Sequence, residues 1–162
     1  ANRWIMFAES YKSDNSSFSK KIQSLKLLYN LKHSTDDNQF INILLDSDIL
    51  KDIKEDSIKQ EVFLTILSVA GEDLKDDYVG NRTLIDERSM PSRYLLNKIK
   101  NSSEIKNFGE LALSVNISII DKKWIETHPE HLRIILSALR ENNIEGIFNK
   151  IVLEILEEST II

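Results

Sequence analysis

The sequence predicts an all-α protein, and three observations support this prediction. Apolar residues recur at intervals of three and four along most of the chain, which is the period of an amphipathic helix. Only four glycines and two prolines occur among 162 residues, whereas all-β folds rely on those residues for their many tight turns. The chain is 41% hydrophobic and 29% charged, an ordinary globular balance. We therefore expect one helical domain over residues 1–162, long enough to bury a sizeable core.

In the first half of the chain, apolar spacing and breaks predict four helices. Polar breaks with N-cap chemistry lie at 14–17 and 33–37, and Gly71 follows the last apolar residue where a left-handed residue ends a helix. Residues 46–56 are acidic and interrupted. The predicted helices cover residues 4–11, 18–28, 40–45 and 57–70.

In the second half of the chain, residues typical of helix N-termini indicate where the helices begin. Residues 72–89 are hard to interpret, and we expect a short helix inside a long connection. Pro91 suits the first turn of a helix that continues to residue 100, and Ser102 or Ser103 is the predicted cap of the next helix, over 105–119. Thr127 and Glu130 have the spacing of a capping box, followed by helices over 130–142 and 144–155.

These elements amount to eight or nine helices with short connections. Two arrangements satisfy such a pattern: stacked helical hairpins in a solenoid-like array, or an orthogonal bundle. One echo favours the stack, because Ile66-Leu67-Ser68-Val69 recurs as Ile135-Leu136-Ser137-Ala138. The tetratricopeptide pattern is absent, so the sequence indicates no family.

Composition excludes several classes of function. The net charge is −5 and no basic cluster occurs, which disfavours nucleic-acid binding. No apolar run has the length of a membrane span. Cysteine is absent, which rules out disulfides, zinc thiolates and cysteine nucleophiles. Because the chain begins at Ala1, we expect either a fragment of a longer chain or a protein exported after removal of a signal peptide; a cytoplasmic location stays open.

Candidate metal and catalytic sites are weak. His128 and His131 are three residues apart on a predicted helix, but Pro129 lies between them and the spacing fits a surface helix N-terminus better. Acidic stretches beginning at Asp46 and Asp73 lack the glycine of a calcium-binding loop at its sixth position. Salt bridges flanking a helix explain the charged group Asp86, Glu87, Arg88 and Arg93. We expect no metal and no cofactor.

Three aromatic residues are the candidates for binding a partner: Trp4, Phe7 and Trp124. The helix containing Trp4 is apolar on nearly all sides, so we expect Trp4 to be buried, with a contact outside this fragment contributing, either to another chain or to a missing neighbouring domain. A homo-oligomer through this N-terminal helix is one such contact. The sequence thus predicts a helical protein-interaction or scaffold module without catalytic activity. The alternative is a helical accessory domain of an enzyme, or an enzyme whose pocket joins distant residues.

Overall fold

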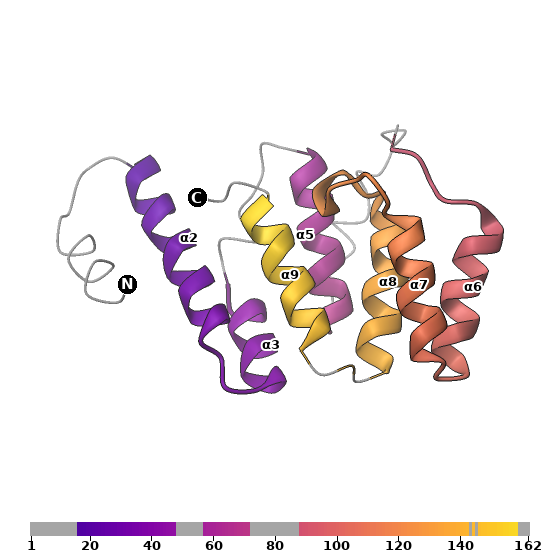
Figure 1. Ribbon diagram of the computed structural model, residues 1–162. Coiled ribbons are helices and arrows are strands. Elements are labelled where there is room, and N and C mark those ends of the chain that lie inside the picture. The colour runs from indigo at the N-terminus through magenta and orange to yellow at the C-terminus, as the bar shows by residue number, and fades with distance from the viewer. Residues whose placement is uncertain (1–15, 48–56, 72–87, 143, 145, 159–162) are drawn as a thin grey trace.

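The computed structural model describes residues 16–47, 57–71, 88–142, 144 and 146–158. Within these residues the chain forms seven α-helices, one short 3-10 helix and no strand (Figure 1). The all-α prediction is therefore confirmed for the described part, with slightly fewer helices than the eight or nine predicted for the whole chain. The elements are α2 (Ser16–Lys32), α3 (Asp37–Leu45), α5 (Ser57–Ala70), α6 (Arg93–Glu104), α7 (Phe108–Ser118), η2 (Trp124–Glu126), α8 (Pro129–Glu141) and α9 (Ile147–Glu158).

The helices stand side by side in a row, with α2 and α3 at one end and α6 and α7 at the other (Figure 1). Helix α8 is central, because it packs against α5, α6 and α9. Its interior face accounts for this position: seven of its residues are buried. They are His131, Leu132, Ile134, Ile135, Leu136, Ala138 and Leu139.

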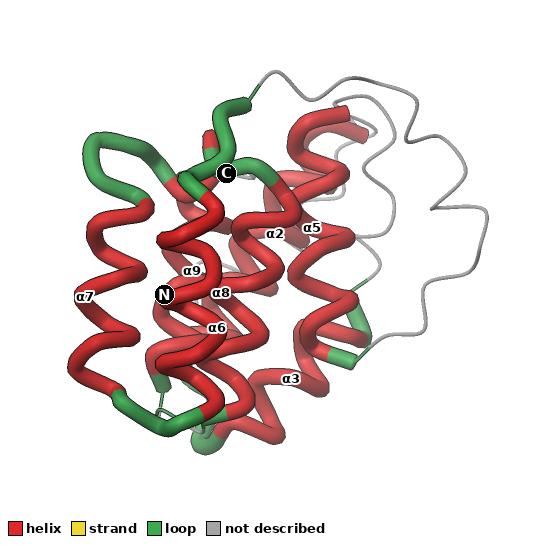
Figure 2. The backbone as a smooth tube through the Cα atoms, turned by 90° about the vertical axis from the view of Figure 1, so that its right-hand side faces the viewer, coloured by secondary structure: helices red, strands yellow, loops and turns green. Residues whose placement is uncertain are grey.

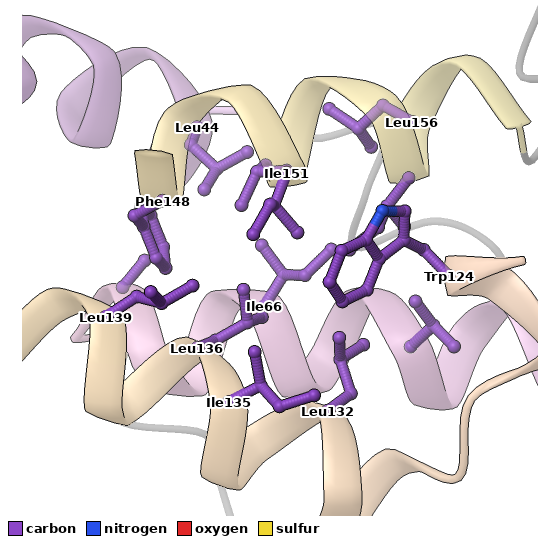
Figure 3. Close-up of a cluster of buried hydrophobic side chains, with 14 of the residues drawn as sticks. Leu44, Ile66, Trp124, Leu132, Ile135, Leu136, Leu139, Phe148, Ile151 and Leu156 are labelled. Atoms are coloured by element: carbon purple, nitrogen blue, oxygen red, sulfur yellow. The ribbon is translucent and has the colours of Figure 1, made fainter. Parts of the chain in front are cut away.

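The short repeat shared by residues 66–69 and 135–138 lies at the contact between α5 and α8. Ile66 and Leu67 on α5 and Ile135 and Leu136 on α8 are all fully buried. The two helices run parallel, since the guanidinium of Arg140, near the end of α8, donates a hydrogen bond to the carbonyl of Val69, near the end of α5. The repeated Ile-Leu pair therefore supplies matching parts of one interface (Figure 3).

The first and last described helices also touch. Helix α9 packs against α2 as well as α8, and the amide of Asn149 donates to a carboxylate oxygen of Asp37 at 2.5 Å. The α8–α9 pair thereby closes against the α2–α3 pair. The core between them contains Leu44 of α3, Ile66 of α5, and Phe148 and Ile151 of α9, side chains that point toward one another in Figure 3.

The structure corrects the predicted boundary between α6 and α7. Ser102 and Ser103 do not cap a helix; both are buried in the last turn of α6. The hydroxyl of Ser103 faces α8, where it accepts from Asn142 at 2.6 Å. Asn107 is the cap instead, since its side chain accepts from the backbone N–H of Glu110 at 3.2 Å. A serine can satisfy its hydroxyl across a helix interface as well as at a cap, and sequence spacing does not distinguish the two.

Details at the starts of two further helices differ from the prediction, although α8 begins with Pro129 in its first turn as expected. Ser92, not Pro91, precedes α6 and caps it. Thr127 forms no capping box with Glu130, because it ends η2 and its hydroxyl donates to the carbonyl of Lys123 at 3.3 Å. His128 caps α8 instead, with its Nδ1 accepting from the N–H of Glu130 at 3.1 Å.

Some predictions fall outside the described residues. They include the first helix with Trp4 and Phe7, the short helix expected within 72–89 apart from its last two residues, and the acidic stretch from residue 48 onward. Among the described helices, none has both the length and the apolar character needed to cross a bilayer.

Two glycines are expected to respond to alanine with opposite signs. Gly71 ends α5 with φ +107°, a conformation that disfavours any side chain. Gly71→Ala should therefore lower the free energy of unfolding by about 1–2 kcal/mol. Gly109 is helical, and a Cβ added there would meet only Asn107 Oδ1 at 3.9 Å. Gly109→Ala should therefore raise the free energy of unfolding by up to about 1 kcal/mol. Urea unfolding of both variants tests this, and equal shifts would contradict it.

Candidate interaction surface on helix α7

Helix α7 is anchored to the bundle by its inner face. Leu111, Ser114, Val115 and Ser118 are buried on that side. The three residues between α6 and α7 form a tight turn, in which the N–H of Asn107 donates to the carbonyl of Ser102 at 2.9 Å. This short connection holds the two helices as an antiparallel pair.

An ion pair further fixes α7 beside α6. Lys98 Nζ lies 2.6 Å from Glu110 Oε1, and both side chains are partly exposed. The hydrogen bond and the opposite charge raise the pKa of Lys98 and lower that of Glu110. Because solvent screens such a pair, it sets the register of the helices more than their stability.

The outer face of α7 is exposed and apolar. Five large hydrophobic side chains in and beside this helix are between 49% and 69% exposed, a range that excludes core packing among the described residues. They are Ile105, Phe108, Leu113, Ile117 and Ile120. Gly109 and Ala112 lie exposed between them. Figure 2 shows α7 at the edge of the molecule, with no described helix on its outer side. We call this surface the α7 stripe.

No charged residue lies on the α7 stripe. Its one polar residue is Asn116, whose amide donates to the carbonyl of Ala112 in its own helix at 2.8 Å. The side-chain amide of Asn116 is thus hydrogen-bonded within its own helix and does not need a partner protein. The remaining exposed large hydrophobics of the described chain are scattered over other elements: Leu25, Met90, Tyr94 and Ile147. Single exposed apolar residues are normal, whereas a contiguous patch commonly marks an interaction site.

The sequence contains a signal for this surface, because the segment that forms α7 has apolar residues on more than one face. Ile105, Phe108, Leu111 and Val115 follow one helical period, yet Leu111 and Val115 are buried whereas Ile105 and Phe108 are exposed. Leu113 and Ile117 lie off the core-facing positions of that period. A helix with apolar residues on both faces needs a neighbour on both faces. Only the inner neighbour is present among the described helices.

Trp124, predicted as a partner-binding residue, contributes to the core. It is 8% exposed, and its indole N–H donates to Glu154 on α9 at 3.1 Å. Figure 3 shows its ring directed into the hydrophobic cluster, toward Ile66 and Leu132. The N–H of Ile125 donates to Glu158 at 3.2 Å, so two carboxylates of the acidic C-terminal helix hold η2 in place. Trp4 and Phe7 lie outside the described residues.

The histidine pair is not arranged as a metal site. His128 caps α8 through its ring nitrogen, whereas His131 is fully buried one turn later. No group of three or more potential metal ligands occurs among the described residues. His131 Nε2 lies 2.9 Å from the hydroxyl of Ser118, which itself lies 2.7 Å from the carbonyl of Val115 and donates to it. The imidazole then donates to Ser118, and its Nδ1 has no hydrogen-bond partner.

The Ser118–His131 pair has the composition of an activated nucleophile, but its surroundings do not suit one. Both side chains are buried, and the hydroxyl proton is already engaged with Val115. Burial lowers the pKa of His131 to about 4, with the charges of Lys122 and His128 acting in the same direction. The pair joins α7 to α8 inside the protein, where a substrate has no access.

The grooves beside α8 are shallow and mixed in charge. One, of about 270 Å³, lies between α6 and α8 and is lined in part by Lys100, Glu104, Arg133 and Glu141. Arg133 is already engaged by Glu130 through two hydrogen bonds, at 2.6 and 2.9 Å. His131 lines neither this groove nor its neighbour beside Val69. The groove therefore lacks the convergent, strongly shifted acid or base that a catalytic pocket requires.

Comparisons with protein-family models, with curated proteins and with solved structures give no match. The surface geometry is therefore the basis of the functional interpretation.

Proposed function

We propose that this chain is a helical protein-interaction module that binds its partner through the α7 stripe. The observation that carries the proposal is the group of five exposed hydrophobic side chains, three on α7 (Phe108, Leu113 and Ile117) and two just beyond its ends (Ile105 and Ile120). Together they expose on the order of 500 Å² of apolar surface, which is at the upper end of what monomeric proteins show. Leaving such a patch in water is unfavourable, and covering it is the simplest use for it.

We infer that the helices behind this surface do not form a simple open solenoid. In a solenoid each repeat contacts only its neighbours along the chain. Contact between α2 and α9, which lie at opposite ends of the described sequence, does not fit that order. The proposed binding surface is accordingly the outer side of one helix and not the concave groove that a solenoid would offer.

The chemistry of the stripe defines the partner. Burying about 500 Å² of apolar surface contributes about 12 kcal/mol. Association itself costs about 4–15 kcal/mol, so the stripe alone gives weak binding at best. A partner that buries an apolar surface of its own roughly doubles the gain. The partner is therefore a protein with an exposed hydrophobic helix or groove, and not a charged polymer.

Site-specific photo-cross-linking tests the proposed surface. A benzophenone amino acid is placed at Leu113 or Ile117 on the stripe, or at Asn42, an exposed position on α3 that serves as the control. In cells or extract of the native organism, we expect defined protein adducts at positions 113 and 117 and few at 42. Leu113→Glu should abolish the adduct formed from position 117. Equal labelling at all three positions would contradict the proposal.

A further inference from the structure

We propose that acid releases helix α7 from the bundle, and that the buried His131 is the group whose protonation triggers the release. This inference goes beyond the proposed function, because it concerns how firmly the helix behind the α7 stripe is held. Three features of the fold carry it: the small buried face of α7, the hydrogen bond that joins α7 to α8, and the charges around His131.

Helix α7 is held to the rest of the protein by little buried surface. It packs mainly against α6. Leu111 and Val115 are its buried large apolar side chains, whereas Phe108, Leu113 and Ile117 are exposed. An element with few buried apolar contacts opens locally at a lower free energy than the rest of a protein. We therefore expect α7 to open while the core formed by α5, α8 and α9 stays folded.

Among the described residues, one hydrogen bond joins α7 to α8. His131 Nε2, on α8, lies 2.9 Å from the hydroxyl of Ser118, the last residue of α7. That hydroxyl donates in turn to the carbonyl of Val115, one turn back in α7. Both side chains are buried, and Nδ1 of His131 has no hydrogen-bond partner. The neutral imidazole suits this arrangement, whereas the protonated ring does not, because its Nδ1–H would be buried without an acceptor.

The charged groups around His131 also oppose its protonation. Lys122, in the turn after α7, and His128, at the start of α8, both disfavour a positive charge on the ring. The carboxylate of Glu130, next in the chain, is engaged by Arg133. Among the described residues, no carboxylate of α5, α6, α7, η2 or α9 offsets these charges. The ring therefore takes up a proton readily only where water reaches it, and opening α7 admits water.

The size of the effect follows from the two protonation equilibria. In the closed protein, burial and then the charges of Lys122 and His128 lower the pKa of His131 from 6.5 to about 4. Opening α7 returns the ring to water and to its ordinary pKa. The equilibrium constant for opening should therefore rise about 70-fold between pH 7.5 and pH 4.5. Well above pH 6.5 the ring is neutral in both forms, so opening there does not depend on this group.

Engineered cysteines measure this opening, since the chain has no cysteine of its own. Ser114 is buried on the inner face of α7, and Thr65 is buried on α5 in the core. Each variant, Ser114→Cys or Thr65→Cys, is labelled with a dipyridyl disulfide, which still reacts with thiols in acid. Each labelling rate is divided by that of a free cysteine peptide at the same pH. We expect a rise of about 70-fold at position 114 from pH 7.5 to pH 4.5, and a far smaller rise at position 65.

His131→Gln shows whether the imidazole is the trigger. Glutamine still offers Ser118 a donor but does not titrate, so the acid-dependent rise at position 114 should fall to that at position 65. If circular dichroism shows this variant to be unfolded, amide exchange of the wild type, corrected for the intrinsic rate at each pH, gives the same comparison between α7 and α5. Equal acid acceleration in the two helices would mean that the whole protein unfolds and would overturn the inference. A rise at position 114 that persists in folded His131→Gln would overturn it as well.

Discussion

Leu136→Ala is expected to lower the free energy of unfolding by about 2–5 kcal/mol, the largest effect of any substitution considered. Leu136 is fully buried on α8, the helix that contacts α5, α6 and α9. Removing its side chain leaves a cavity between Ile66 and the helices around it, and the rigid core collapses only partly into such a space. A domain of ordinary stability loses a large fraction of its 5–15 kcal/mol in this way.

Leu113→Ala is the matched control. It makes the same chemical change on a helix, but at a side chain that is mostly exposed on the α7 stripe. We expect a change within about 0.5 kcal/mol. Urea unfolding at one fixed protein concentration measures both variants, because dimerisation would make stability depend on concentration. Equal losses at the two positions would mean that the α7 stripe is covered by the same chain.

The sequence predicted the helices well where apolar spacing and a terminating residue agreed. Helix α5 ends at Ala70 as predicted, and Gly71 follows it with a positive φ. Helix α8 ends at Glu141, immediately before the predicted stop at Asn142. In these places local backbone chemistry decides the boundary, and local chemistry is visible in a sequence.

Boundaries were wrong where a polar side chain bonds across the fold. Ser103 has the chemistry of a helix cap, yet its hydroxyl lies between α6 and α8 and contacts residues more than thirty positions away. Such partners depend on which helices become neighbours. A single sequence does not specify that.

The interaction surface was missed for a related reason. Periodicity shows that one face of a helix is apolar, but it does not say how many neighbours the helix has. Leu113 and Ile117 follow the same helical spacing as buried Leu111 and Val115, displaced around the axis. Only the position of α7 at the edge of the bundle distinguishes the two sets (Figure 2). The partner-binding roles predicted for Trp4 and Phe7 stay predictions, since both lie outside the described residues.

Acid is expected to destabilise the protein through His131. This imidazole is fully buried, and burial lowers its pKa from 6.5 to about 4. In the unfolded chain the same ring takes up a proton near pH 6.5, whereas the folded protein holds it neutral until pH 4. Between those values the unfolded state binds more protons, so stability falls as pH falls. The contribution is fully present above pH 6.5 and is lost by pH 4, an effect of about 3 kcal/mol.

The comparison of two histidine variants isolates this effect. Carboxylates such as Glu130, whose pKa is lowered by its hydrogen bond with Arg133, also weaken the fold in acid, so the wild-type slope alone is not diagnostic. In His131→Gln the group that titrates is gone, and the loss of stability between pH 7 and pH 4 should shrink by about 3 kcal/mol. His33→Gln, at an exposed histidine, should keep the wild-type loss. Urea unfolding at a series of pH values measures all three proteins. If His131→Gln and the wild type lose stability equally over that range, the buried imidazole is not held neutral in the folded state.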